Sequence, residues 1–172
     1  LKNDIALSFD DALKCQFDIA CPILKERNIS SFFFIYSSLF KSEPDMLEVY
    51  RYFRNSCYKN INIFYEDFFN MVKTKDKEKY NTALRNFNVN NYLKEYDFYT
   101  PKDKWFRFLR DIFLDEKIYN KLMIELMHKK RFNKETILSK LWMTEKNISK
   151  LASEGHIIGL HSYYHPTHIA KK

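Results

Sequence analysis

The sequence predicts an α/β protein with parallel strands and a long, mainly α-helical insertion. Three observations predict this fold class. Two short apolar runs flank a helical apolar stripe near the N-terminus, and a third apolar run follows a capped helix near the C-terminus. The long region between them has the periodicity of amphipathic helices. With 172 residues, we expect one main domain that carries this insertion.

The first apolar run covers residues 5–9 and stops at two adjacent carboxylates, Asp10 and Asp11. This pattern is typical of a buried parallel strand with acidic residues at its carboxyl end. We therefore expect both aspartates to lie at the edge of a sheet.

The first helix and second strand complete the segment 1–40. Residues 12–27 have an approximately helical apolar stripe, in which Pro22 predicts a kink or a break. Asn28 closes this helix, and residues 31–36 form a second apolar run. A strand, a helix and a strand so close together predict a βαβ unit with two parallel, neighbouring strands.

The insertion covers residues 41–134 and is rich in aromatic side chains. Its helices are predicted to break near Asn60, Thr74, 88–91, Pro101, Asp115 and Asn133. Met and aromatic residues at helical spacing are far more often core residues than cofactor ligands, so we expect them to fill a helical core.

The α/β pattern resumes in residues 135–172. Thr144 and Asn147 are suitable caps for the start of a helix, and Gly155 suits the left-handed position after its end. Residues 156–160 then form a third apolar run. We expect this run to be a third buried strand of the same sheet.

The net charge of +7 favours acidic partners, but basic and acidic residues alternate throughout the middle of the chain. The longest internal basic run is 129–131. We expect a solvated, salt-bridged helical surface and no nucleic-acid partner, with nucleic-acid binding by the basic helices as a weaker alternative. No apolar stretch of about 18 residues is present, so no membrane span is predicted.

The three cysteines, Cys15, Cys21 and Cys57, have neither zinc-ribbon nor redox-motif spacing, and their odd number does not suggest a disulfide scaffold. We interpret them as thiols of a reducing compartment and expect a cytoplasmic protein.

Two histidines, His161 and His165, follow the third strand with a spacing that lets both bind one cation if the backbone turns helical there. The carboxyl ends of parallel strands meet at one edge of a sheet, so these histidines are expected to lie near Asp10 and Asp11. Two histidines and one aspartate would form a three-ligand metal site with a position left for water. The alternatives are a helix cap for the aspartates and a polar loop for the histidines.

The motifs carry a family resemblance. Ser8-Phe9-Asp10-Asp11-Ala12 resembles the (T/S)-F-D-D-G motif of the polysaccharide deacetylase family, the NodB-homology enzymes of carbohydrate esterase family 4. His161-Ser162-Tyr163-Tyr164-His165-Pro166 resembles the family's H-(S/T)-x-x-H-P motif. Residues 22–35 and 151–159 are similar to the family's flanking segments, so the resemblance covers roughly residues 4–40 and 135–170.

The resemblance implies a partial distorted (β/α) barrel of the NodB-homology type. It implies that Asp11, His161 and His165 bind a divalent metal, with zinc expected, and that Asp10 is the general base that deprotonates the attacking water. The implied reaction is removal of an acetyl group from an N-acetylated sugar of a polysaccharide or glycan precursor, such as a bacterial cell-surface glycan. The implied partner is therefore a carbohydrate substrate.

Supporting roles follow for two neighbours of these ligands. Ser162 is expected to hold the loop between the histidines through a backbone hydrogen bond, and Pro166 suits the first turn of a following helix. Three other histidines are interpreted differently: His168 as solvated, His156 as structural and His128 as exposed.

The chain departs from the family pattern in three respects. Ala12 replaces the usual Gly, which we expect to be tolerated if φ stays negative there. The insertion is long, and the family's later motifs, including the Leu-x-His that supplies the catalytic acid, have no counterpart. The alternative function is therefore a catalytically incomplete metal- or glycan-binding fragment. Its helical insertion or exposed strand edges would mediate self-association.

Overall fold

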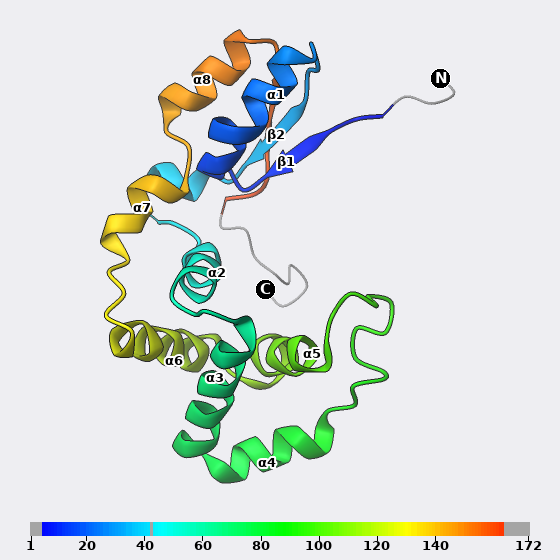
Figure 1. Ribbon diagram of the computed structural model, residues 1–172, viewed down its shortest axis with the longest axis vertical. Coiled ribbons are helices and arrows are strands. Elements are labelled where there is room, and N and C mark those ends of the chain that lie inside the picture. The colour runs from blue at the N-terminus through cyan, green and yellow to red at the C-terminus, as the bar shows by residue number, and fades with distance from the viewer. Residues whose placement is uncertain (1–4, 42, 164–172) are drawn as a thin grey trace. The chain divides into compact units, whose positions relative to one another are not determined.

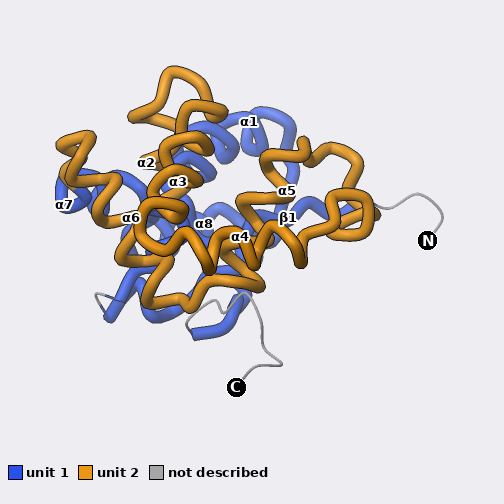
Figure 2. The backbone as a smooth tube through the Cα atoms, turned by 90° about the horizontal axis from the view of Figure 1, so that it is seen from below, with its two compact units in different colours: residues 1–49, 134–172 blue, residues 50–133 orange. Residues whose placement is uncertain are grey.

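The computed structural model describes residues 5–41 and 43–163. The described chain is a mixed α/β protein, mostly helical, with one small parallel sheet (Figure 1). It divides into two compact units (Figure 2). The first unit comprises residues 1–49 and 134–172, and the second comprises residues 50–133.

The sheet of the first unit has three strands, β1 (Ser8–Asp10), β2 (Phe32–Ile35) and β3 (Ile157–Leu160), in the order β1-β2-β3. Both pairings are parallel. The prediction of parallel neighbouring strands from two apolar runs is confirmed. The third run joins on the other side of β2, which becomes the central strand.

β1 is shorter than the apolar run that predicted it and ends one residue later. Its partner begins at Phe32, opposite Ser8, and the Phe32 N–H donates to the Leu7 carbonyl at 2.9 Å. No residue of β2 extends far enough to pair with Ile5, which is highly exposed. The length of an edge strand depends on its partner, and the apolar run alone does not contain that information.

One face of the sheet is covered by α1 (Cys21–Glu26) and α8 (Glu145–Ser153), which Figure 1 shows beside it. The core between them contains residues of all three strands and both helices. These residues are Phe9, Phe17, Cys21, Leu24, Phe33, Met143, Ile148, Leu151 and Ile158. Burial of such apolar surface is the main term that stabilises the unit. Other elements of the unit are η2 (Ser37–Lys41), the start of α2 (Met46–Ser56) and α7 (Glu135–Leu141).

Pro22 lies within the first turn of α1, and a π-type turn, η1 (Gln16–Ala20), comes immediately before it. The Cys21 N–H donates to the Gln16 carbonyl, five residues back, so the hydrogen-bond spacing is wider than in an α-helix. The predicted disturbance at Pro22 is therefore a change of helical type and not a break.

The predicted helix ends are confirmed. Thr144 and Asn147 form a reciprocal capping box at the start of α8. Asn28 and Gly155 adopt left-handed backbone conformations after α1 and α8, with φ of 52° and 88°. These residues are the types that tolerate such a conformation, which explains why both ends were predictable.

The second unit consists of the end of α2 and further helices. These are α3 (Ile61–Lys75), α4 (Lys77–Asn86), α5 (Pro101–Phe108), η3 (Leu109–Phe113) and α6 (Glu116–Lys129). Its core is built from aromatic rings, as predicted: Phe64, Phe68 and Tyr119 all contact the ring of buried Phe106. Such ring pairs favour edge-to-face geometry, and all three of these contacts adopt it.

Charged side chains lie on the helix surfaces of this unit. Lys130 contacts Asp67 at 3.4 Å and lies over the Tyr58 ring, while Lys75 contacts Glu125 at 2.9 Å. The charges of these two lysines are thus balanced locally by carboxylates. None of the helices in residues 5–41 and 43–163 has both the length and the apolar character needed to cross a membrane.

Candidate metal centre

The carboxyl ends of the three strands define one edge of the sheet, where candidate site residues meet. The Asp11 N–H donates to the Phe34 carbonyl at 3.0 Å, and the His161 N–H donates to the Ile35 carbonyl at 2.7 Å. The backbones of Asp11 and His161 are therefore both hydrogen-bonded to the central strand. This pairing brings together two residues that are far apart in the sequence.

The chain turns sharply after both outer strands. Asp11, Ala12 and Ser162 have φ values of 72°, 53° and 74°. The condition under which Ala12 was expected to be tolerated, a negative φ, is not met, because this buried alanine occupies the left-handed region that favours Gly. The Met143 N–H donates to the Ala12 carbonyl at 2.8 Å and helps to hold the turn. Such backbone strain often occurs at functional sites.

The side chains of Asp11 and His161 approach each other across this edge. Asp11 Oδ1 lies 3.7 Å from His161 Nε2, and the two side chains are 15% and 37% exposed. This distance is too long for a hydrogen bond. Two such atoms bound to one zinc in tetrahedral geometry lie about 3.4 Å apart. The pair therefore fits a shared metal ion after a movement of a few tenths of an ångström.

The other members of the predicted ligand set are only partly described. His165 and Pro166 lie outside the described residues. Within residues 5–41 and 43–163, no group of three or more His, Cys, Asp or Glu side chains is arranged to hold a metal ion. The Ser162 carbonyl accepts a hydrogen bond from the Ser37 N–H at 3.3 Å, and the predicted role of Ser162 in the loop up to His165 stays a prediction.

Asp10 is the last residue of β1 and is exposed. Its backbone carbonyl accepts a hydrogen bond from Gln16 Nε2 at 2.6 Å. Its carboxylate makes no hydrogen bond or ion pair with another described residue, which leaves it accessible to water and able to accept a proton. The N-cap position of the following helical segment is occupied by Cys15, without a side-chain capping bond.

A group of polar residues that sequence reasoning missed surrounds Tyr36, directly after β2. The Tyr36 side chain is fully buried, and its hydroxyl accepts a hydrogen bond from the Asp45 N–H at 3.2 Å. Burial raises the pKa of this hydroxyl, and the nearby carboxylates of Asp45, Asp11 and Glu48 raise it further. Glu48 itself is only 4% exposed. In the sequence, the position of Tyr36 at the end of the second apolar run was the signal that could have pointed to this polar group.

The other histidines have different surroundings or lie outside the described residues. His156 is buried; its Nδ1 accepts a hydrogen bond from the Ser31 N–H at 3.2 Å, and its ring meets Phe33 edge-on. His128 is exposed on α6. His168 lies outside the described residues.

The three cysteines are free thiols, and no histidine or carboxylate joins them in a metal-binding group within the described ranges. Among family models, curated proteins and solved structures, none gives a significant match to the chain. The geometry of the sheet edge and the two short motifs are therefore the observations that bear on function.

Proposed function

We propose that the carboxyl edge of the sheet is the metal site of a hydrolase that removes an acetyl group from an N-acetylated sugar of a polysaccharide or glycan precursor. The observation that carries this proposal is the 3.7 Å separation of Asp11 Oδ1 and His161 Nε2, with Asp10 next in sequence. The pattern of the two motifs supports the substrate class. A divalent metal, with zinc expected, is the proposed cofactor.

Asp11 and His161, joined by His165, are the proposed metal ligands. When bound, zinc would supply Lewis acidity that activates water and polarises the acetyl carbonyl. Asp10, which is exposed beside Asp11, accepts the proton of the attacking water. The water oxygen forms a bond to the carbonyl carbon, the C–N bond breaks, and acetate and a free sugar amine result after the nitrogen gains a proton.

The same proposal treats β1, β2 and β3 as the first strands of a distorted (β/α) barrel. α1 and α8 cover the face that carries Phe9, Phe33 and Ile158. The outer helices of a (β/α) barrel cover one face of its strands in this way, and the opposite face lines the interior. This arrangement supports the proposed architecture.

Acetate release tests the reaction. The chain is loaded with zinc and incubated with an N-acetylglucosamine oligosaccharide, and acetate is measured with time. Asp10→Asn is expected to keep the metal and to lower the rate by at least about 100-fold, because a general base is removed. Glu26→Gln, an exposed carboxylate change on α1, is the matched control and should have no effect. Full activity of the Asp10→Asn variant would assign the base to another group.

A second candidate function is a metal- or glycan-binding fragment that associates with itself. Specific observations favour it: β3 is an edge strand, and its Leu160 and Ile157 are 79% and 52% exposed. Exposed apolar edges promote pairing with another chain. Zinc binding without acetate release, together with self-association, would favour this candidate over the hydrolase.

A further inference from the structure

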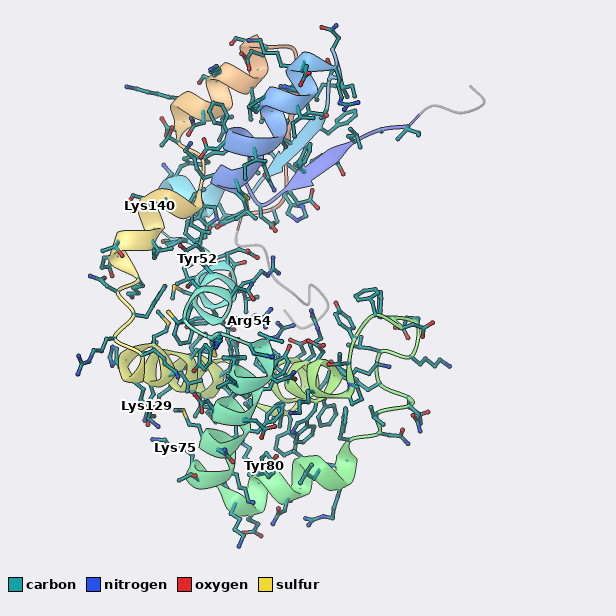
Figure 3. The ribbon with its side chains drawn as sticks, viewed as in Figure 1. Tyr52, Arg54, Lys75, Tyr80, Lys129 and Lys140 are labelled. Atoms are coloured by element: carbon teal, nitrogen blue, oxygen red, sulfur yellow. The ribbon has the colours of Figure 1, made fainter. Side chains whose placement is uncertain are left out.

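Two arginines of the second unit (residues 50–133), called the helical unit below, lie over the same aromatic ring, that of Phe106. Arg54 comes from α2 and is labelled in Figure 3, and Arg110 comes from η3. Their Cζ atoms lie 5.4 and 5.8 Å from the centre of the Phe106 ring. Both side chains are partly buried, so their charges are weakly screened by water.

The charges of these arginines are compensated differently. Arg110 forms a two-pronged ion pair with Asp111, in which Nη2 lies 2.8 Å from Oδ2 and Nε donates to Oδ1. Arg54 has no carboxylate partner among the described residues, and its buried Nε has no hydrogen-bond acceptor there. Buried polar groups are nearly always paired, so this exception requires an explanation.

The surroundings of Arg54 strengthen the contrast. Burial lowers the pKa of its guanidinium, and the nearby charges of Arg110 and Arg51 act in the same direction. The neutral hydroxyls of Tyr65 and Tyr119 are its polar neighbours, and the Tyr65 hydroxyl already donates to Asp103. The Arg54 guanidinium therefore carries a positive charge that a negative ligand would neutralise.

We propose that Arg54 and Arg110 bind the oxyanion group of a small ligand, a phosphate or a carboxylate, beside the Phe106 ring. The planar guanidinium presents donors in the fork geometry that matches two oxygens of such a group. The buried Tyr119 hydroxyl, whose ring centre lies 6.3 Å from that of Phe106, is the third donor. This site belongs to the helical unit and is independent of the proposed metal centre.

Arginine side-chain NMR tests this site directly. The complete chain, uniformly labelled with ¹⁵N, is titrated with inorganic phosphate or acetate while chloride keeps the ionic strength constant. The Arg54 Nε–H signal, assigned by its loss in Arg54→Lys, should shift and saturate. Arg54→Lys keeps the charge but loses the fork, so it should weaken binding about tenfold. Arg85→Lys, the same change at an exposed site on α4, is the control and should leave the affinity unchanged.

The two titrations also identify the ligand class. A stronger response to phosphate assigns a phosphate group, and a stronger response to acetate assigns a carboxylate. If Arg54→Lys does not fold, Tyr119→Phe replaces it, since it keeps the ring and removes only the third donor. Its phosphate affinity should fall about threefold. Equal affinity of wild type and these variants, or a shift that does not saturate, would overturn the proposal.

Discussion

Gly159 of β3 leaves space for the ring of Phe34 on the neighbouring strand. A Cβ atom at Gly159 would lie only 2.6 Å from both Phe34 Cδ1 and Cε1, closer than carbon atoms can approach. The register of β2 and β3 places Gly159 beside Phe34, two residues before His161. The close packing of these two residues thus helps to set the position of a proposed metal ligand.

Gly159→Ala is expected to destabilise the sheet by about 1–3 kcal/mol, because the added methyl group forces the Phe34 ring or the strand to move. Urea unfolding measures this free energy. In the background of Phe34→Leu, which removes the ring, the same change should cost much less. An equal cost in both backgrounds would show that the contact with the ring is not the cause.

Ala12→Gly is expected to stabilise the protein by up to about 1 kcal/mol, although Gly usually destabilises. The reason is the φ of 53° at Ala12, which strains an alanine and not a glycine. Ala152→Gly on α8 is the matched control and should lower the stability by about 0.5–1 kcal/mol. A loss of stability in Ala12→Gly as large as in the control would contradict the left-handed turn.

The lowered pKa of Asp103 predicts that the stability of the helical unit falls in acid. Burial alone would raise the pKa of its carboxyl group, but hydrogen bonds from Thr100 and Tyr65 outweigh burial and lower the pKa below the ordinary 3.8. The native carboxylate thus holds its proton less tightly than the unfolded one. Its stabilising contribution is present above the unfolded pKa and is lost as the pH falls through the lowered native pKa.

Unfolding in urea between about pH 3 and about pH 6 measures this effect. The stability of wild type should fall more steeply below about pH 4 than that of Asp103→Asn. A Trp142→Phe background leaves Trp105 as the only tryptophan, so fluorescence reports on the helical unit. Asp97→Asn, at an exposed loop position, should behave like wild type. Identical acid dependence in Asp103→Asn would refute the role of these hydrogen bonds.

Self-association is predicted to involve the exposed edge of β3. Leu160→Lys places a charge on this edge and is expected to shift the protein towards the monomer. Light scattering coupled to size-exclusion chromatography gives the mass. Leu84→Lys changes an exposed leucine on α4 in the same way and should not alter the mass. A wild-type chain that is already monomeric at high concentration would rule out this association.

The sequence predicted the features that depend on local patterns. The three strands followed from apolar runs, and the ends of α1 and α8 followed from Asn28, Thr144 and Gly155. In each case, the residue type has a conformational or capping preference that acts over a few positions. The approach of Asp11 and His161 was also predictable, because the carboxyl ends of parallel strands share one edge.

The features that sequence reasoning missed depend on tertiary partners. The length of β1 is set by where β2 begins, and the left-handed turn at Ala12 is held in part by the Met143 N–H. In the sequence, Tyr36 resembles an ordinary strand residue and Glu48 an ordinary helix residue. Only the fold buries both and brings Asp11 and Glu48 near Tyr36. No local pattern encodes such contacts.

Metal binding is the most direct test of the central claim, that Asp11 and His161 share one ion. The chain is saturated with zinc, freed of excess metal and analysed by elemental mass spectrometry. Wild type and His128→Ala, a control at an exposed position, should retain about one zinc per chain. Asp11→Ala and His161→Ala should lose it while far-UV circular dichroism shows that they remain folded. An unchanged zinc content in both of these variants would contradict the account.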